Sequence, residues 1–227
     1  MYFKIIFYII LLYLLFSIIY AEKIITLNAE NTIKIDRSIS ETLVSKVIYQ
    51  LSLSTHNPIY LYINTPGGDV KWGNLLIDNI EYYSRNKTII CIAHYAASMG
   101  FAILQACPFR YGTKHSTFMQ HRITTTINGD KEKIENYINY LQYLENEFID
   151  FQVKRIGISR ELFIKKTYTD WYLNGIGALK ENIIDELVLV GCELNYVNTT
   201  YIEIEDKNNI KIYNTFSNCP IITKPIR

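Results

Sequence analysis

Residues 58–68, PIYLYINTPGG, are the stretch of this sequence that decides the fold. The first six are mostly β-branched or aromatic and carry no charge, which is typical of a strand buried inside a sheet. The last five are residues that break regular structure, so the strand ends there. Trp72, Leu76, Ile80 and Tyr83 follow at the spacing of one helical face. The stretch therefore predicts a buried strand, a tight turn and a helix.

The same alternation of strand and helix continues toward the C-terminus. We expect strands at 88–93, 110–113, 117–120 and 183–190, and a β-prone run at 123–127. We expect helices at 96–106, from 130 to about 155, and from Ser159, with a loop at 167–172. Strands that alternate with helices predict an α/β fold with a mostly parallel sheet and flanking helices.

The ends of the chain extend this pattern. Residues 23–27 and 32–35 are expected to form short strands, and the segment 38–41, SISE, has capping-box spacing before a helix that carries Leu43, Val47 and Leu51 on one face. Residues 192–227 are expected to form two strands and a polar end. We therefore divide the chain into an N-terminal segment 1–21, one domain 22–191 and a C-terminal extension 192–227 of unknown role.

Composition and charge exclude several classes of protein. The 227 residues are 49% hydrophobic and 20% charged, which excludes intrinsic disorder and low-complexity architectures. Lys and Arg number 23 against 22 Asp and Glu, so the net charge is +1. A chain this balanced has no general electrostatic reason to bind nucleic acid.

The first 21 residues have the pattern of a targeting segment. An apolar run from Ile5 to Ala21 follows Lys4 and is interrupted only by Ser17. This pattern predicts a secretory signal peptide, or an uncleaved membrane anchor, since Ile19 stands where a small residue is preferred before cleavage. We expect the protein in the secretory pathway or associated with a membrane.

The four cysteines, Cys91, Cys107, Cys192 and Cys219, are able to pair in an oxidising compartment. They form no CxxC pair, so we expect no zinc site. Cys91 lies in an apolar strand and is expected in the core.

Two turns carry residues with chemical potential. Gly67 and Gly68 either make a tight turn or leave bare N–H groups facing a ligand; the phosphate-loop and dinucleotide fingerprints are absent. Ser98, in the segment 96–100, AASMG, is either a helix cap or a nucleophile at the positive end of a helix dipole. In the second case the Met99 N–H is free to stabilise an oxyanion.

A nucleophilic serine needs a base and a group that orients the base. His121 follows the strand 117–120, and His94, close to Ser98 in sequence, is the rival base. Asp170 lies in a predicted loop beside aromatic residues that would shield it from water. For each residue the alternative is a solvated or hydrogen-bonded loop side chain.

Several of these segments, taken in order, resemble the ClpP family of serine peptidases. They are 60–68, 90–92 leading to 96–100, 118–121, 167–173 and 177–185, and the resemblance covers about residues 23–190. It implies a ClpP/crotonase-like fold with a long handle-type helix. It also implies Ser98 as nucleophile, His121 as general base and acid, and Asp170 as the group that orients His121. The N–H groups of Gly68 and Met99 would form the oxyanion hole. No metal or organic cofactor is implied.

The chain departs from the family pattern in three places. Residues 122–127, RITTTI, replace a proline and a glycine-rich strand after the histidine. Thr169 stands where an arginine commonly helps to pair two rings, which puts a double ring in doubt. One extra residue lies between the strand 90–92 and Ala96, at His94-Tyr95.

The resemblance implies a homo-oligomeric ring that acts on peptides or unfolded proteins. We expect a serine endopeptidase that cleaves short or unfolded peptides through a Ser-His-Asp triad and an acyl-enzyme. An ATP-dependent unfoldase partner is not expected in the secretory pathway. The alternatives are a non-catalytic ClpP-like subunit, a hydrolase resembling the signal-peptide peptidases, and a crotonase acting on acyl thioesters.

Overall fold

The computed structural model describes residues 22–207 and 210–226. The predicted signal or anchor segment 1–21 lies outside the described residues. Within the described ranges, none of the helices combines the length and the apolar character needed to cross a bilayer.

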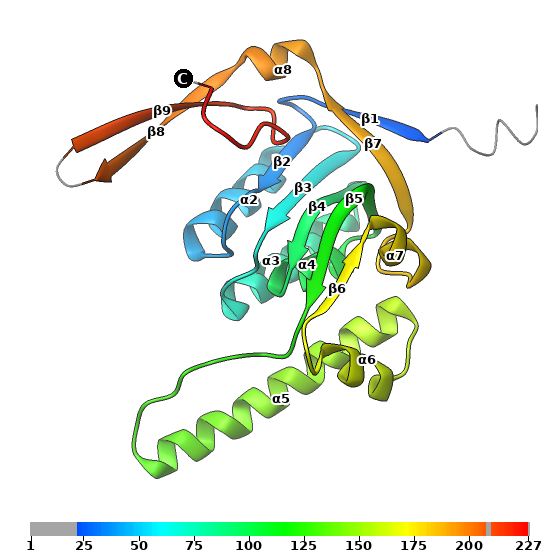
Figure 1. The fold of residues 1–227 in the computed structure, drawn as a ribbon, viewed down its shortest axis with the longest axis vertical. Coiled ribbons are helices and arrows are strands. Elements are labelled where there is room, and N and C mark those ends of the chain that lie inside the picture. The colour runs from blue at the N-terminus through cyan, green and yellow to red at the C-terminus, as the bar shows by residue number, and fades with distance from the viewer. Residues whose placement is uncertain (1–21, 208–209, 227) are drawn as a thin grey trace, which may run out of the picture.

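One sheet of seven strands forms the centre of the molecule (Figure 1). Its order is β1-β7-β5-β4-β3-β2, with β6 paired to β5. Every pairing is parallel except that of β5 with β6, so the expected α/β class with a mostly parallel sheet is confirmed. The strands are β1 (Lys23–Leu27), β2 (Thr32–Ile35), β3 (Ile59–Thr65), β4 (Ile89–Ala97), β5 (Phe109–Gln120), β6 (Trp171–Asn174) and β7 (Glu186–Cys192).

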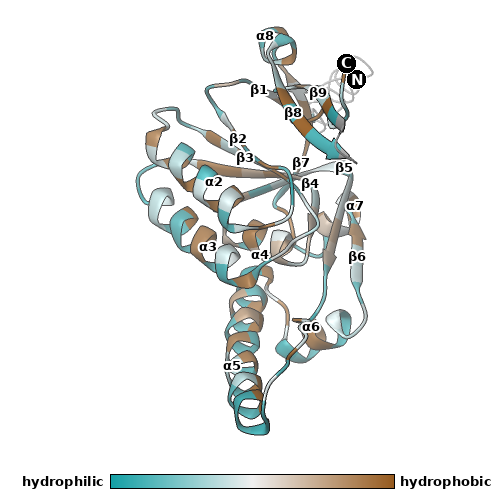
Figure 2. Ribbon diagram, turned by 90° about the vertical axis from the view of Figure 1, so that its left-hand side faces the viewer, coloured by the Kyte–Doolittle hydropathy of each residue, from teal (hydrophilic) through white to brown (hydrophobic). Residues whose placement is uncertain are grey.

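Helices α2, α3 and α4 cover one face of this sheet (Figure 2). A long helix, α5, extends away from the sheet, and α6 lies beside its C-terminal part (Figure 1). The helices are α2 (Glu41–Leu53), α3 (Val70–Ser84), α4 (Met99–Ala106), α5 (Lys131–Ile156), α6 (Arg160–Thr167) and α7 (Gly175–Lys180).

Apolar side chains fill both faces of the sheet. The larger cluster lies between the sheet and its helices, and the expected helical face of Leu43, Val47 and Leu51 is buried in it. The smaller cluster lies on the opposite face and includes Ile90 and Ile92. Burial on both faces explains why β3 and β4 are nearly continuous apolar runs rather than alternating ones.

The C-terminal residues cover part of the second cluster. They form helix α8 (Leu194–Asn198) and an antiparallel hairpin of β8 (Thr200–Lys207) and β9 (Ile210–Ser217). Tyr196 of α8 and Cys219 after β9 are both buried against the sheet. The two strands expected in this segment are present, together with a helix that the sequence did not indicate.

Several expected boundaries were wrong. Residues 110–113 and 117–120 belong to one strand, β5, which is interrupted by a bulge. Strand β4 continues to Ala97, so helix α4 begins only at Met99. Residues 123–127 form no strand. The predicted loop 167–172 is overlapped by α6 and β6.

The cap of α2 is Ser40 rather than Ser38. The Leu43 N–H donates to Ser40 Oγ over 3.4 Å, and the helix begins at Glu41. The capping-box spacing at 38–41 therefore pointed to the correct turn but to the wrong serine.

Two disulfides join all four cysteines, Cys91 to Cys107 and Cys192 to Cys219. Their Cα–Cα distances are 6.0 and 6.1 Å, within the ordinary range for this bond. Cys91 is buried in the core as expected, and its thiol is not free.

Candidate active site

Three neighbouring parallel strands end at the same edge of the sheet. These are β3, β4 and β5, and the residues that follow them include Gly68, Ser98 and His121. The carboxyl ends of parallel strands are where functional groups gather in α/β folds. The structure therefore brings together residues that are far apart in the sequence.

Ser98 lies in the turn between β4 and α4 with φ 54° and ψ −117°. Positive φ is uncommon for a residue other than glycine and marks a turn held by its surroundings. The Ser98 N–H donates to the Met119 carbonyl over 2.8 Å, and Met119 pairs with Ala97 across β4 and β5. The side chain makes no capping hydrogen bond, so the interpretation of Ser98 as an ordinary helix cap is wrong.

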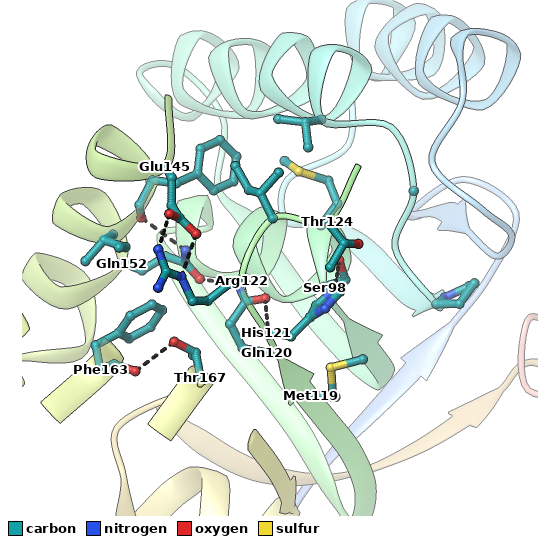
Figure 3. A pocket seen from close by; sticks show the side chains of 17 residues that line it. Ser98, Met119, Gln120, His121, Arg122, Thr124, Glu145, Gln152, Phe163 and Thr167 are labelled. Atoms are coloured by element: carbon teal, nitrogen blue, oxygen red, sulfur yellow. Dashed lines mark hydrogen bonds and ion pairs between the residues drawn. The ribbon is translucent and has the colours of Figure 1, made fainter. Parts of the chain in front are cut away.

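The Ser98 hydroxyl faces the His121 imidazole. Ser98 Oγ lies 2.7 Å from His121 Nε2, the distance of a hydrogen bond (Figure 3). His121 is the first residue after β5, and its N–H donates to the Gln120 side-chain oxygen over 3.0 Å. His121 comes two residues after Met119, the residue of β5 whose carbonyl accepts the hydrogen bond from the Ser98 N–H.

The rival base, His94, lies elsewhere. It is exposed and forms a bulge in β4, where the register shifts between Ala93 and Tyr95. His121 rather than His94 is the histidine hydrogen-bonded to Ser98.

Asp170 is near His121 along the backbone, but their side chains do not meet. β6 pairs with β5 so that Trp171 lies opposite Gln120, the last pair of the ladder, and His121 and Asp170 are the residues next to that pair. Asp170 is exposed, as are Tyr168 and Tyr172, so the expected shielding by aromatic residues was wrong. Within the described ranges, no hydrogen bond joins the Asp170 carboxylate to the His121 ring.

Two backbone N–H groups that belong to residues lining the cavity beside Ser98, Gly68 and Met99, have no internal acceptor among the described residues. Ile39 bonds to the turn through the Gly67 carbonyl and the Asp69 N–H, at 2.8 and 3.0 Å, which leaves the Gly68 N–H directed to the other side. Met99 is the first residue of α4, where no preceding turn supplies an acceptor. In the described part of the chain neither N–H donates to another group, so both are available to a ligand oxygen.

Gly67 holds this turn against the serine. Its φ is +96°, and a Cβ built there would lie 2.7 Å from both the Ala97 carbonyl oxygen and Ser98 Cβ. Only glycine allows this approach of two backbones together with this φ. Glycine at position 67 therefore keeps this turn in contact with the backbone and Cβ of the Ser98 turn.

A cavity of about 380 Å³ opens beside these groups. Ser98 and His121 line one end, and Gln152, Phe163 and Thr167 line the other (Figure 3). Arg122 and Glu145 form a bidentate ion pair in its wall. The hydrogen bonds from Arg122 lower the pKa of the Glu145 carboxyl, and they outweigh partial burial, which by itself raises that pKa.

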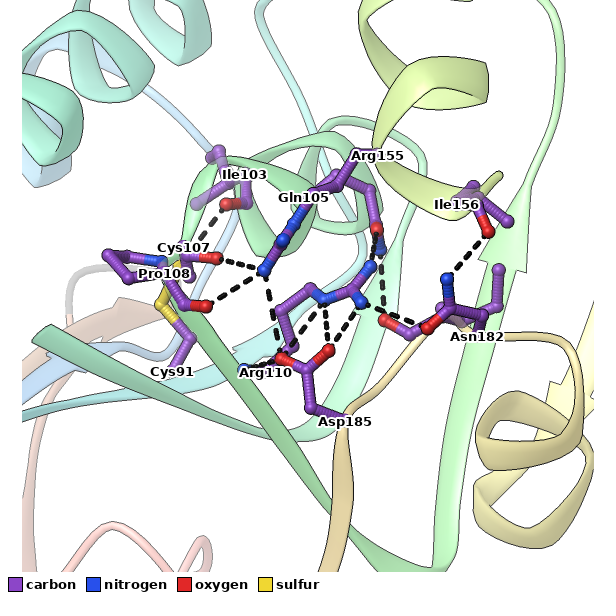
Figure 4. Close-up of polar contacts among 11 residues, drawn as sticks. Cys91, Ile103, Gln105, Cys107, Pro108, Arg110, Arg155, Ile156, Asn182 and Asp185 are labelled. Atoms are coloured by element: carbon purple, nitrogen blue, oxygen red, sulfur yellow. Dashed lines mark hydrogen bonds and ion pairs between the residues drawn. A yellow bond between two sulfur atoms is a disulfide. The ribbon is translucent and has the colours of Figure 1, made fainter. Parts of the chain in front are cut away.

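Sequence reasoning missed the buried cluster that supports β5 at its start. Arg110 is almost fully buried and donates to Gln105, Asn182 and Asp185 (Figure 4). Burial alone raises the pKa of the Asp185 carboxyl, but the hydrogen bonds from the Arg110 side chain and backbone outweigh it and lower the pKa. An arginine at the start of an apolar strand was the only signal for this cluster in the sequence.

The described residues offer no group of three or more His, Cys, Asp or Glu side chains placed to hold a metal ion. The reactive groups that the structure places around Ser98 are its hydroxyl, the His121 imidazole and backbone N–H groups. Serine hydrolases use these groups for acyl transfer: a base next to a serine hydroxyl, and N–H donors for the oxygen that becomes charged.

Comparison with known proteins gives the particular family. The family model described as Clp protease matches residues 11–190. The chain is 30% identical over 178 residues to an ATP-dependent Clp protease proteolytic subunit of Borrelia garinii subsp. bavariensis. The matched region covers 77% of this chain and 89% of that relative. A protein of the same description from Borreliella afzelii is 28% identical over 177 residues, covering 77% of this chain and 87% of the relative.

The chain therefore belongs to the Clp protease family, and it is a proteolytic enzyme, a serine endopeptidase of the ClpP type. This confirms the family and the enzyme class expected from the sequence. The family match ends at residue 190, so the C-terminal extension lies beyond it.

Proposed function

We propose that this chain cleaves peptides through an acyl-enzyme formed on Ser98. His121 takes the proton from the Ser98 hydroxyl as it attacks the scissile carbonyl, and then gives a proton to the leaving amine. The observation that carries the proposal is the 2.7 Å distance between Ser98 Oγ and His121 Nε2.

The Gly68 and Met99 N–H groups stabilise the oxygen of the tetrahedral intermediate. Each donor is already held in place, Gly68 by the bridge to Ile39 and Met99 by the start of α4. Preorganised donors of this kind are each worth about 3 kcal/mol of transition-state stabilisation. Water then hydrolyses the ester on Ser98, with His121 again as the base.

Asp170 is proposed to orient the His121 imidazole during turnover. The β5–β6 ladder ends at the pair Gln120 and Trp171, so Asp170 and His121 are the residues next to that pair, and the exposed Asp170 side chain is proposed to turn toward the ring. A carboxylate on the second ring nitrogen holds the imidazole in the tautomer that accepts a proton from serine.

Labelling with a fluorophosphonate probe and hydrolysis of a short fluorogenic peptide test these roles. We expect Ser98→Ala to abolish labelling, and Ser98→Ala and His121→Ala each to lower kcat at least about 1,000-fold. The matched controls Ser52→Ala and His115→Ala, both at exposed positions outside the cavity, should keep wild-type rates. Labelling that persists in Ser98→Ala would contradict the nucleophile.

Asp170→Asn separates an enzyme with a triad from a non-catalytic subunit. If Asp170 orients His121, kcat falls by about 10⁴ with little change in KM. An unchanged kcat would exclude the triad and leave a dyad. Absence of any Ser98-dependent activity in the wild type would favour the alternative of a non-catalytic ClpP-like subunit, for which the exposed position of Asp170 is the supporting observation.

We propose that the protein acts in the secretory pathway or at a membrane. Two disulfides support an oxidising compartment, and the apolar run at residues 5–21 supports export. The relatives are named as ATP-dependent. Because ATP-driven partners are not expected in that compartment, we propose cleavage of short or unfolded peptides without ATP.

Membership in the Clp protease family supports a homo-oligomeric ring acting on peptides, and we extend this assembly to the present chain as a proposal. Sedimentation of the purified protein tests it: a ring gives a mass that is a multiple of the mass of the purified chain, which is 26.6 kDa when residues 1–21 are retained. A species of single-chain mass that hydrolyses peptide at the full rate would contradict a required ring.

A further inference from the structure

The far end of the cavity beside Ser98 is polar, although apolar side chains make up much of its walls. Phe148, Ile149 and Phe163 line the walls. Gln120, Gln152 and Thr167 also line the cavity and are each at least 96% buried. Polar side chains this deeply buried are costly unless they are hydrogen-bonded.

The two glutamines form a hydrogen-bond chain whose direction is fixed at both ends. The His121 N–H donates to Gln120 Oε1, so Gln120 must turn its Nε2 toward Gln152, where it donates to Oε1 over 2.5 Å. Gln152 Nε2 then donates to the Phe148 carbonyl over 3.1 Å. A backbone donor at one end and a backbone acceptor at the other therefore set the orientation of both amides.

The hydrogen bonds of the two glutamines leave further donors of their side chains unused. A primary amide has two N–H bonds, and within the described ranges each of these amides uses one of them. The Thr167 hydroxyl donates to the Phe163 carbonyl over 2.9 Å, which leaves its oxygen able to accept. The cavity thus offers donors and an acceptor, the complement of a carbonyl joined to an NH₂ group.

The charged groups of the wall already neutralise each other. Arg122 and Glu145 are paired through both guanidinium and carboxylate atoms, and Arg122 is the more exposed partner. A charged substrate side chain would have to break this pair or remain unpaired in a partly buried space, at a substantial cost. The cavity therefore fits a neutral side chain.

We propose that this cavity selects peptides whose residue on the acyl side of the scissile bond has a neutral hydrogen-bonding side chain, glutamine above all, with Gln152 as the residue that determines specificity. The inference rests on the proposed function. When the scissile carbonyl lies against the Gly68 and Met99 N–H groups, the side chain of that residue branches one bond from the carbonyl carbon and extends into this space. A leucine there leaves the free N–H bonds and the Thr167 oxygen without a partner from the substrate, which disfavours it relative to glutamine.

The test uses fluorogenic peptides that differ only in the residue on the acyl side: glutamine, methionine, leucine, glutamate or lysine. For the wild-type chain we expect kcat/KM at least about tenfold higher for glutamine than for leucine, with glutamate and lysine lowest. Methionine matches the length of glutamine and lacks the amide, so it separates hydrogen bonding from shape.

Gln152→Met removes the amide with little change in size. We expect the glutamine-to-leucine ratio to fall to about one, because the rate for glutamine falls and the rate for leucine rises. Gln142→Met is the matched control on the exposed surface of α5, outside the cavity, and should keep the wild-type ratio. Thr167→Val, which removes the acceptor, is a second variant and should also lower the ratio. Gln120 is left unchanged because it holds the His121 N–H.

The outcomes separate this inference from the proposed function. Ser98-dependent cleavage that favours leucine over glutamine in the wild type would overturn the inference alone, as would an unchanged ratio in both Gln152→Met and Thr167→Val. Cleavage that survives Ser98→Ala would overturn the proposed function and the inference with it.

Discussion

At the scale of single residues, the site depends on how closely two turns approach each other. Gly67 lies against the backbone and Cβ of the Ser98 turn, and each turn contains a residue with positive φ. A methyl group added at Gly67 would therefore press on both the backbone and the side chain of the Ser98 turn.

Gly67→Ala should destabilise the fold and lower activity. The added Cβ would meet the Ala97 oxygen and Ser98 Cβ at 2.7 Å, and φ +96° is strained for alanine, so we expect a loss of about 2 kcal/mol in the free energy of unfolding. Gly191→Ala is the control, since a Cβ there has no atom within 4 Å, and it should stay within about 0.5 kcal/mol of wild type. Denaturant unfolding measures both; equal stability of the two variants would contradict the close approach.

Asp185 should make stability depend on pH. Its pKa is lowered in the folded protein, so the ionised carboxylate contributes stability above the unfolded pKa of about 4, and the contribution is lost as pH falls through the lower folded pKa. We expect Asp185→Asn to lower the free energy of unfolding by about 2 kcal/mol at pH 7. The expected loss is modest because the carboxylate is about one-third exposed and solvent screens its charge.

The difference in the free energy of unfolding between wild type and Asp185→Asn should decrease below about pH 4. Asp78→Asn, at an exposed position on α3, is the matched control and should show no such change. Urea unfolding at pH 7 and at acid pH measures the effect, and a difference that grows on acidification would show that the sign is wrong.

At the scale of elements, α5 combines two environments in one helix. Its buried residues, Ile149, Gln152 and Ile156, all lie in the C-terminal part. The N-terminal part exposes Tyr137, Ile138, Tyr140 and Tyr143. Packing supplies most of the stability of a helix in a protein, so the two parts should differ in local stability.

Hydrogen exchange should resolve this difference. We expect amides 135–145 to exchange at least about tenfold faster than amides 149–156 in the single chain. Helix α4, which is almost entirely buried, serves as the protected reference in the same experiment. Uniform protection along α5 in the single chain would contradict the expectation.

At the scale of the whole molecule, the C-terminal segment belongs to the packing of the sheet. It contributes Tyr196 and Cys219 to the apolar cluster opposite the helices, and the Cys192–Cys219 disulfide closes it onto β7. Burial raises the pKa of Tyr196 to about 12, with a smaller effect of the Asp36 charge, as expected for a phenol held in this cluster.

Replacing both Cys192 and Cys219 by serine should loosen this face of the molecule. A disulfide between residues 27 positions apart contributes about 3 kcal/mol to the free energy of unfolding. We expect a lower melting temperature and increased binding of a hydrophobic dye. Peptide hydrolysis at low temperature should persist, because the residues proposed as catalytic lie at the ends of β3, β4 and β5 rather than in this segment. An unchanged melting temperature would contradict a stabilising role.

Much of the candidate site could be predicted from the sequence, because its members follow buried strands. Gly68, Ser98 and His121 each come after a recognisable apolar run, and parallel strands bring their ends to one edge. The position of the Asp170 side chain could not be predicted in this way. It depends on the pairing of β6 with β5, in a region that the sequence indicated only as a loop.

The amino-acid sequence by itself determined most strands and helices of the sheet and the turns at Gly67-Gly68 and at Ser98, although not β6 or α8, because backbone preferences and apolar periodicity act over a few neighbouring residues. Only the tertiary structure decided which distant groups meet. Ser98 reaches His121 across 23 positions, Gln120 reaches Gln152 across 32, and Cys192 reaches Cys219 across 27. These contacts depend on strand order and on how α5 and the C-terminal segment pack against the sheet, and no local preference encodes a distance between residues so far apart in the chain.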